Sequence, residues 1–469
     1  MKTHYSRRQF LRTAGTAASV MIVGHSVLNA MAGPATPPLV RRNLAGMDPS
    51  DPVITSYQSA IMAMQALPAT NPLSWTYQAA IHGTTIIPPL TAWNSCTHGT
   101  YYFWSWHRMY LYWFERIVRK MSGNLAWTLP YWDWTANPQL PVMFRDATSD
   151  LYTANRDPAM NDGSGSLSPS AVTYASSFSL TNFTSASNLF QGTPHGAVHV
   201  GVGGWMSSVP TAAQDPIFFP HHCNVDRLWN LWLAQGGGRQ DPLNDPAWQG
   251  TQFTFFDENG NQVQMTGCDV LRAADQLNYV YEGEPAQVLE YCLAPPTNLH
   301  VLMLREVFFH PQWPGATLTS VPVARSIDIT PVRPQLADIL TNQTEILVLE
   351  LDGVEAEEQP GIFWEVYLGT TARRNLDSKS PYYVGNVVLF GDGVHSEAHH
   401  GGHHTFKPAQ FAFPINRAMQ AALRSRRNSL PVTFVPRGLL IDGKPSRPIP
   451  KADVTVGDIS FTIEKTGGN

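Results

Sequence analysis

Charged side chains are scarce in this chain of 469 residues. Asp, Glu, Lys and Arg together make up 14 % of it, whereas aromatic residues make up 11 %. This balance is typical of a densely packed, aromatic-rich enzyme core and argues against a disordered protein. Positive charge is not in excess either, because 31 Lys and Arg face 36 Asp and Glu, for a formal net charge of −5. The charge balance therefore argues against nucleic acid as a partner.

Cysteine and long hydrophobic runs are also scarce. The four cysteines do not make a disulfide scaffold in a chain of this length. Cys268 and Cys292 could pair in an oxidising compartment, but the sequence does not fix the connectivity. Beyond the N-terminal region no segment approaches about 18 consecutive apolar residues, which a membrane-spanning helix needs. We therefore expect a soluble mature protein that has no membrane contact.

The first 32 residues are basic and weakly apolar. They contain four Lys or Arg residues and no acid, and positions 6–11 read Ser-Arg-Arg-Gln-Phe-Leu. With a weakly apolar segment and the Ala-Met-Ala of positions 30–32 behind it, this stretch resembles a twin-arginine export signal. We predict that residues 1–32 are a signal peptide read by the twin-arginine export machinery, and that the protein is periplasmic or secreted. The alternative is a frayed basic tail or a short anchor.

The predicted secondary structure changes from helices to strands near residue 250. Before it, "SWHRMYLYWFERIVRKM" at 105–121 places apolar residues three and four apart, as an amphipathic helix does, and residues 221–233 repeat the pattern. Stretches rich in Gly, Ser, Asn and Pro between these helices predict long loops. After it, "TQFTFFDENGNQVQM" reads as a β-hairpin, and strand-like runs such as "ILVLELDGV" follow. The predicted domains are a helical domain over 45–295, a linker over 296–340 and a β domain over 341–465.

Histidines gather in two groups, within or just ahead of the aromatic-rich helices. A single histidine on an apolar helix face is more often a hydrogen-bonded core residue than a ligand, but six in two groups indicate a metal site. Imidazole-only sites suit copper, zinc or iron, and the lack of Glu or Asp at ligand-like spacing argues against a carboxylate-rich di-iron bundle. The first group is His82, His98 and His107, and the second is His195, His199 and one of the pair His221 and His222.

His221 and His222 are adjacent at the start of an apolar helix, and either of them could be the metal ligand. Neighbouring residues on a helix point about 100° apart, so we expect only one of His221 and His222 to face a metal ion. The sequence alone does not decide between them. Asp226 lies one helical turn beyond His222, where a carboxylate could orient that imidazole.

Two segments resemble the copper-binding signatures of type-3 copper proteins, which are tyrosinases, catechol oxidases and molluscan haemocyanins. They are "CTHGTYYFWSWHRMYLYWFERI" at 96–117 and "DPIFFPHHCNVDRLWNLW" at 215–232. "LPYWDW" at 129–134 and the β-rich tail are also similar to plant polyphenol oxidases. The resemblance implies a mainly α fold, with a four-helix-bundle dicopper core and long loops. A small C-terminal β-sandwich-like domain follows and covers the active site.

The resemblance further implies two copper ions, each held by three histidines. It favours His222 as the third ligand of copper B, supported by Asn224 and Asp226, and leaves His221 as a supporting or packing residue. Cys96 stands where fungal tyrosinases and molluscan haemocyanins carry a thioether bond, here to His98, and the alternative is a free buried thiol. The implied ligands are His82, His98 and His107 for copper A, and His195, His199 and His222 for copper B.

The implied reaction is the oxidation of o-diphenols to o-quinones, with O2 as co-substrate. Family members that also hydroxylate monophenols well often have an Asn after the first histidine of the second group, and a nearby Glu. Here the corresponding positions are Gly196 and Gln191, and neither is a good base. Val209 resembles the small gate residue of tyrosinases. We therefore expect small phenolic substrates, with diphenol oxidation exceeding monophenol hydroxylation.

Two other functions share part of this pattern. A haemocyanin-like oxygen carrier has the same copper histidines but does not turn over a phenol. A mononuclear zinc hydrolase would use His195, His199 and His222 alone, which leaves His98 and His107 without a role. An assay with catechol separates the first alternative from an oxidase, and a metal analysis separates the second.

Overall fold

The computed structural model describes residues 37–284, 305–342, 345–371, 376–391, 408–425, 427–446 and 448–465. The chain divides into two compact units, Met1–Pro38 and Leu39–Asn469, and all described helices and strands belong to the second. The predicted signal peptide, residues 1–32, and Cys292 lie outside the described residues, whereas Cys268 is disulfide-bonded. In the part of the chain that is described, no helix combines the length and the apolar character needed to cross a membrane.

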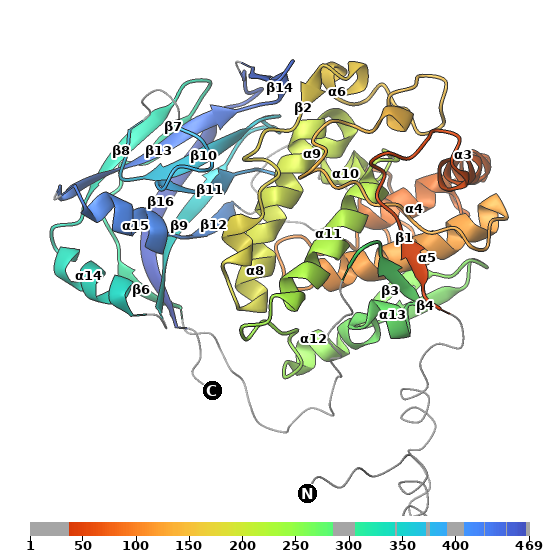
Figure 1. Ribbon diagram of the computed structural model, residues 1–469, viewed down its shortest axis with the longest axis horizontal. Coiled ribbons are helices and arrows are strands. Elements are labelled where there is room, and N and C mark those ends of the chain that lie inside the picture. The colour runs from red at the N-terminus through yellow and green to blue at the C-terminus, as the bar shows by residue number, and fades with distance from the viewer. Residues whose placement is uncertain are drawn as a thin grey trace, which may run out of the picture. The chain divides into compact units, whose positions relative to one another are not determined.

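The core of residues 39–284 is built around four helices (Figure 1). They are α3 (Pro52–Gln65), α4 (Trp75–His82), α5 (Phe103–Ser122) and α11 (Phe218–Ala234). Helix α5 packs against both α3 and α11. Local signals set the helix ends, because the Asp51 side chain accepts a hydrogen bond from the Val53 amide to cap α3, and Gly123 ends α5 at a φ of 73°. The helices predicted at 105–121 and 221–233 are thus confirmed.

Shorter elements connect these helices. They are η1 (Val142–Phe144), α6 (Pro158–Asp162), β2 (Gly165–Ser166), α7 (Ala175–Phe178), α8 (Phe183–Phe190), η2 (Gln191–Gly196), α9 (Ala197–Val202), η3 (Gly204–Ser207), α10 (Val209–Ala212), α12 (Pro246–Gly250), η4 (Gly267–Val270) and α13 (Ala273–Gln276). The predicted hairpin is confirmed, because β3 (Phe253–Phe256) pairs antiparallel with β4 (Gln262–Met265). Strand β1 (Leu39–Arg41) pairs with β5 (Tyr279–Tyr281), so the core begins at residue 39 and not at 45.

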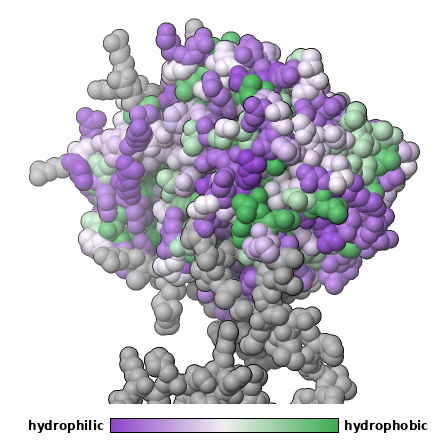
Figure 2. All heavy atoms as spheres, turned by 45° about the vertical axis from the view of Figure 1, so that its right-hand side comes forward, coloured by the Kyte–Doolittle hydropathy of each residue, from purple (hydrophilic) through white to green (hydrophobic). Residues whose placement is uncertain are grey.

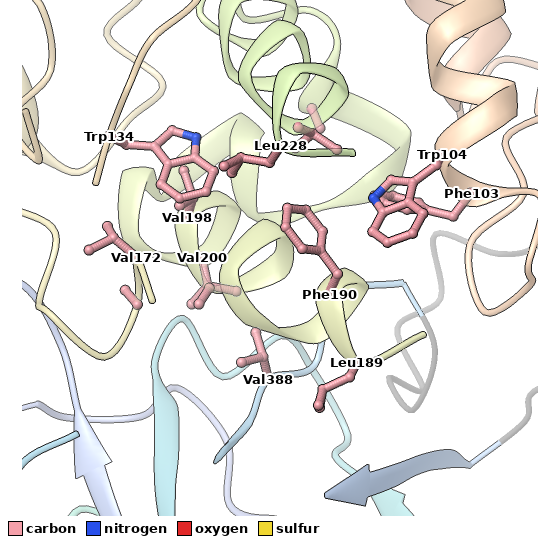
Figure 3. Close-up of a cluster of buried hydrophobic side chains, with 14 of the residues drawn as sticks. Phe103, Trp104, Trp134, Val172, Leu189, Phe190, Val198, Val200, Leu228 and Val388 are labelled. Atoms are coloured by element: carbon pink, nitrogen blue, oxygen red, sulfur yellow. The ribbon is translucent and has the colours of Figure 1, made fainter. Parts of the chain in front are cut away.

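Buried aromatic and aliphatic side chains fill the space between the helices. Figure 3 shows one such cluster, which includes the side chains of Trp104 of α5, Phe190 of α8 and Leu228 of α11. The Trp104 ring also stacks on that of Trp229, with centroids 6.1 Å apart. This packing accounts for the high aromatic content, and it fixes the separation of α5 and α11, which both carry candidate ligands.

Few large apolar side chains are exposed on the described surface. Leu125 and Ile449 are the most exposed of them, at 79 % and 78 %. On the face shown in Figure 2, hydrophilic residues predominate and the hydrophobic ones form separate small areas. Scattered exposure of this kind is ordinary for a globular protein.

The described residues from 305 to 465 form two antiparallel sheets, as expected for a β-sandwich-like domain. One sheet has the strand order β11–β10–β13–β8, and the other has the order β12–β9–β16–β6 with β7 paired to β16. Phe413 of one sheet packs over Gly385 of the other, where a Cβ would come within 2.4 Å of its ring. The glycine thus permits the close approach of the sheets. The elements are β6 (Arg305–Phe309), β7 (Ala316–Leu318), β8 (Val323–Asp328), α14 (Arg333–Thr341), β9 (Glu345–Glu355), β10 (Phe363–Leu368), β11 (Tyr383–Val387), β12 (Ala409–Pro414), α15 (Asn416–Leu423), β13 (Ser429–Arg437), β14 (Leu440–Ile441), β15 (Lys444–Pro445) and β16 (Val454–Lys465).

The predicted linker over 296–340 is wrong where the structure describes it. Strands β6, β7 and β8 and helix α14 lie in this range, and β6 and β8 extend the two sheets. Pro311 and Pro314 suggested a long irregular connection, but they lie in a short irregular segment between β6 and β7. The C-terminal domain therefore begins by residue 305, not at 341.

Paired backbone joins the C-terminal domain to the helical core. Strand β14 pairs antiparallel with β2 of the core, and β15 completes this small sheet (Figure 1). The Asp442 amide extends the pairing by donating to the Ser164 carbonyl at 2.9 Å. A buried side-chain contact adds to it, because Ser185 Oγ donates to the Glu464 carboxylate at 2.9 Å. These contacts fix the position of the C-terminal domain on the core.

Candidate metal centre

The predicted histidines come together in two groups of potential metal ligands. The first group is His82, Cys96, His98 and His107, and the second is His195, His199, His221 and His222. Within each group one ligand atom of every residue lies within 4.8 Å of the others. The two groups face each other, because the rings of His107 and His222 stack with centroids 4.2 Å apart and planes inclined by 7°. All six histidines implied as copper ligands thus converge, from α4, the loop before α5, α5, η2, α9 and α11.

Both adjacent histidines of α11 point into the second group. The expectation that only one of His221 and His222 binds a metal ion stays a prediction, although the rings of both lie in this group. The angle of about 100° separates the Cβ directions of neighbouring residues, whereas the torsions beyond Cβ let both rings turn to the same side. The two rings are fully buried, with centroids 4.9 Å apart.

Backbone carbonyls fix the orientation of four ligand rings. His82, His107, His195 and His199 each place Nδ1 within hydrogen-bonding distance of a carbonyl oxygen. In this order the acceptors belong to Val209 (3.1 Å), Phe103 (2.8 Å), Gln191 (2.9 Å) and Met206 (2.8 Å). A carbonyl oxygen only accepts, so Nδ1 carries the proton and Nε2 keeps its lone pair for a metal ion.

The imidazoles are neutral at physiological pH because they are buried. Burial lowers the pKa of His98 to about 4, and it holds the pKa of His107 and His222 well below the ordinary value, helped by neighbouring imidazoles. The Nε2 atoms of His199 and His222 lie 3.2 Å apart, and two nitrogens on one tetrahedral ion are about 3.3 Å apart. Neutral imidazoles at this spacing fit a copper ion in each group.

Cys96 lies against the rings of the first group as a free thiol. Its Sγ is 3.4 Å from Nδ1 and 3.7 Å from Nε2 of His98, and 3.5 Å from Nε2 of His107. Burial raises the pKa of this thiol, so it is protonated and a weaker ligand than the imidazoles. The sulfur therefore lies beside the ring of His98, and the expected thioether between the two residues stays a prediction.

Asp226 and Asn224 do not support His222 as expected. Among the described residues, Nδ1 of His222 has no hydrogen-bond partner. Asn224 instead accepts from Nη1 of Arg227 at 3.0 Å. The Asp226 carboxylate accepts from buried groups of α5, β1 and β5, which are Arg108, Arg41, Tyr279 and Tyr281. Because two arginines bind this carboxylate more strongly than an imidazole would, Asp226 links α11 to other elements of the core and does not orient His222.

Gln191 and Gly196 occupy the positions expected to handle protons. The Gln191 side chain is engaged by the loop before α5, because Oε1 accepts from the Gly99 amide at 2.7 Å and Nε2 donates to the Thr100 carbonyl at 3.1 Å. A Cβ at Gly196 would lie 3.4 Å from Cβ of Phe390. Gln191 thus positions the loop, and Gly196 leaves room for the C-terminal domain.

Val209 orients the candidate ligand His82 through its backbone carbonyl, and it also lies at the expected gate position. Its carbonyl oxygen is the acceptor for Nδ1 of His82. Its Cγ2 lies 3.3 Å from where Gly391 would carry a Cβ, so a segment of the C-terminal domain contacts the gate. The sequence suggested only the side-chain role.

Two phenylalanines that the sequence analysis missed pack against the ligand rings. The ring of Phe218 lies 4.7 Å from that of His82 and 4.3 Å from that of His222. The ring of Phe103 lies 4.6 Å from that of His107. Each phenylalanine stands four residues before a ligand on the same helix, and this spacing is a signal that could have revealed them.

Phe390 of the C-terminal domain also reaches the ligands. Its ring stacks on His199 with centroids 4.1 Å apart, and it lies edge-on to His98 and His195, at 5.4 Å from each. A cavity of about 260 Å³ beside these rings is lined by residues of both the core and the C-terminal domain. No sequence motif marks Phe390, because the contact depends on how the two domains dock.

Comparison with known proteins agrees with this geometry. The common central domain of tyrosinase matches residues 72–175 and 145–235, and the polyphenol oxidase middle domain matches residues 242–291. A tyrosinase of Hahella sp. (strain CCB-MM4) is 34 % identical over 407 residues, which cover 73 % of this chain and 83 % of that protein. Aureusidin synthase of Antirrhinum majus is 27 % identical over 392 residues, covering 71 % of this chain and 68 % of that protein.

Solved structures show the same fold. Latent apple tyrosinase matches with a TM-score of 0.63 at 22 % identity, over 92 % of this chain and 98 % of that chain. A latent aurone synthase matches with a TM-score of 0.64 at 20 % identity, over 93 % of this chain and 92 % of that chain. With its two facing groups of histidines, this chain belongs to the tyrosinase and polyphenol oxidase family of type-3 copper enzymes, which hold two copper ions.

Proposed function

We propose that this enzyme oxidises o-diphenols to o-quinones and hydroxylates monophenols only weakly. The bound copper pair supplies the exchange of electrons between the diphenol and O2. The observation that carries the proposal is the facing arrangement of the two histidine groups, with the rings of His107 and His222 4.2 Å apart. Because the groups face each other, one small phenolic molecule can be held against both.

The protein contributes rigid ligands and apolar walls. Hydrogen bonds from Nδ1 to backbone carbonyls hold four rings in fixed orientations. The rings are those of His82, His107, His195 and His199. Phe218 and Phe103 pack against these rings and provide the apolar surface that a phenol ring favours. Their bulk also keeps water away from the ligand nitrogens.

The expected weakness toward monophenols rests on the absence of a side-chain base at two positions. Hydroxylation requires that a phenol lose its proton near copper, and a positioned acceptor speeds such a step. The amide of Gln191 is engaged by the backbone of Gly99 and Thr100, and Gly196 carries no side chain. Diphenols depend less on such an acceptor, because their two hydroxyl groups would become more acidic on binding to a pair of metal ions.

Turnover of matched substrates tests the proposal. The copper-loaded chain is assayed with catechol and with phenol, by O2 consumption and by quinone absorbance. We expect quinone formation from catechol at a clearly higher rate than from phenol. Reversible O2 binding without quinone, before and after mild proteolysis, would instead identify a haemocyanin-like carrier.

The C-terminal domain covers the copper site in the intact chain. Contacts of Phe390 with His199, His98 and His195 support this part of the proposal, as does the contact of Gly391 with Val209. Mild proteolysis that removes or displaces this domain is expected to raise catechol turnover. Unchanged turnover after removal of the domain would refute its covering role.

Export through the twin-arginine pathway completes the proposal. The support is the Ser-Arg-Arg-Gln-Phe-Leu stretch at positions 6–11 and the lack of acidic residues in 1–32. We expect replacement of Arg7 and Arg8 by lysine to retain the protein inside a bacterial host. Export that survives this replacement would exclude the twin-arginine route, and cell fractionation with immunodetection measures it.

A further inference from the structure

The side chain of Gln359 joins the C-terminal domain to the helical core. It lies in the loop between β9 and β10, and its Nε2 donates to the carbonyl of Ser207 at 2.8 Å and to that of Leu389 at 2.7 Å. Ser207 belongs to η3 of the core, whereas Leu389 follows β11 in the C-terminal domain. A carbonyl oxygen only accepts, so the amide presents both of its N–H groups to these two oxygens. One side chain therefore ties together two backbone segments of different domains.

Both of these carbonyls lie one residue away from a contact with the same imidazole. Met206, which precedes Ser207, accepts from Nδ1 of His199 at 2.8 Å. Phe390, which follows Leu389, stacks on the His199 ring with centroids 4.1 Å apart. The bridging amide thus holds the segment that covers this ring against the segment that orients it.

Residues 389–391, here called the covering segment, also lie over the expected gate. Gly391 has a φ of 98°, a conformation that favours glycine. A Cβ at this position would lie 3.3 Å from Cγ2 of Val209 and 4.0 Å from Cβ of His98. The backbone of the covering segment therefore approaches both histidine groups closely, with Gln359 bound at its first residue.

Other contacts dock the C-terminal domain without Gln359 or the covering segment. Strand β14 pairs with β2 of the core. The Asn386 side chain donates from Nδ2 to the Ser170 carbonyl at 2.8 Å, and Ser185 Oγ donates to the Glu464 carboxylate at 2.9 Å. The domain can therefore stay docked on the core when the covering segment moves away from the ligand rings.

We propose that Gln359 is a latch, whose two hydrogen bonds hold the covering segment over the metal centre. When both bonds break, the site opens locally while the domain stays docked. A single hydrogen bond contributes little net free energy, so thermal motion can break both without unfolding the domain. Gln359 is a positioning residue, because it acts through the covering segment. The inference rests on the proposed covering role of the C-terminal domain, and it adds a route of access that needs no proteolysis.

Catechol turnover by the full-length, copper-loaded chain tests the latch. Gln359→Met keeps the size of the side chain and removes both donors, and Gln359→Glu also places carboxylate oxygens against the two carbonyls. We expect turnover to rise about tenfold in Gln359→Met and further in Gln359→Glu. Gln420→Met, at an exposed position of α15 in the same domain, is the matched control and should equal the wild type.

Mild proteolysis that displaces the domain separates the two possible failures. After this treatment we expect all of these proteins to oxidise catechol at the same rate, because Gln359 has no part in the chemistry. If proteolysis activates the wild type but neither variant of Gln359 exceeds the wild type before treatment, the latch is refuted and the covering role stands. If proteolysis activates no protein, the covering role itself is refuted.

Hydrogen exchange of the full-length chain, followed by mass spectrometry, shows the opening without any turnover. We expect peptides that contain residues 388–391 to exchange about tenfold faster in Gln359→Met than in the wild type and in Gln420→Met. Peptides from β14 and β2 should exchange at the wild-type rate. Unchanged exchange of the covering segment overturns the proposal, and so does faster exchange in all three regions, which would mean that the whole domain undocks.

Discussion

The ring of Phe390 lies nearly parallel to that of His199, with centroids 4.1 Å apart and planes inclined by 18°. One residue belongs to the C-terminal domain, and the other is a candidate metal ligand of the second group, on α9. Under the proposed function, the ring of a phenolic substrate is expected to contact the surface that Phe390 occupies. We therefore expect access to the second histidine group to depend on docking of the C-terminal domain.

Removing this ring should increase activity without removing the domain. Phe390→Ala loses an aromatic stacking contact of about 1 kcal/mol, which corresponds to a rise of about fivefold in catechol turnover by the full chain. Phe309→Ala, which removes a ring packed on Phe461 in the same domain, is the matched control and should leave turnover unchanged. Initial rates of O2 consumption measure both. Equal rates for the two variants and the wild type would show that Phe390 does not limit access.

An asparagine at position 196 should favour monophenols once the site is open. In the intact chain its side chain would meet Phe390, because a Cβ there lies 3.4 Å from the Phe390 Cβ. We therefore make Gly196→Asn in protein whose C-terminal domain has been displaced by mild proteolysis, where an added acceptor is expected to raise the ratio of monophenol to diphenol turnover by about tenfold. Gly196→Ala in protein treated in the same way adds a Cβ without an amide and should leave the ratio unchanged. A ratio that is the same in both would exclude a proton-handling role for this position.

Asp226 should matter more for stability than for chemistry. Its carboxylate is buried and accepts from Arg41 at 3.2 Å and also from Arg108, so Asp226→Asn leaves two buried guanidinium groups under-compensated. We expect a loss of about 3–5 kcal/mol in the free energy of unfolding. Asp133→Asn is the matched control, because that carboxylate is part-exposed and lies 3.8 Å from Arg227, so it should lose less than about 1 kcal/mol. Urea unfolding measures both, and similar losses would argue against the buried network.

The apoprotein should lose stability as the pH falls below about 6.5, the pKa of histidine in an unfolded chain. Burial lowers the folded-state pKa of His98 to about 4 and that of His221 to about 3. A lowered folded-state pKa gives stability that is complete above the unfolded pKa and is lost as the pH falls toward the folded value. We expect the urea midpoint of the apoprotein to fall between about pH 7 and pH 5, and to fall less in His221→Gln. A midpoint that does not change over this range would contradict the burial of neutral imidazoles.

The sequence predicted the ligands better than their surroundings. The i, i+4 spacing of His195 and His199 and the apolar stripe around His107 are local patterns, and they survive in the fold as the continuous turn of η2 and α9 and as α5. The partners of Asp226 and the position of Phe390 depend on contacts between segments far apart in the chain, which local periodicity does not encode.

The convergence of the adjacent histidines was missed for a different reason. Helical periodicity gives the directions of Cβ atoms, whereas side-chain torsions decide where the rings of His221 and His222 end. The linker was also misjudged, because Pro311 and Pro314 mark a short irregular segment between two strands and not a long linker. In each case the tertiary packing, not the local pattern, set the outcome.

The most direct test of the central claim is the ratio of initial O2-consumption rates with catechol and with phenol. It is measured on protein that carries two copper ions per chain and whose C-terminal domain has been displaced by mild proteolysis. We predict a catechol rate clearly above the phenol rate, with quinone as the product. A phenol rate equal to or above the catechol rate, or O2 uptake without quinone, would contradict the proposed diphenol oxidation.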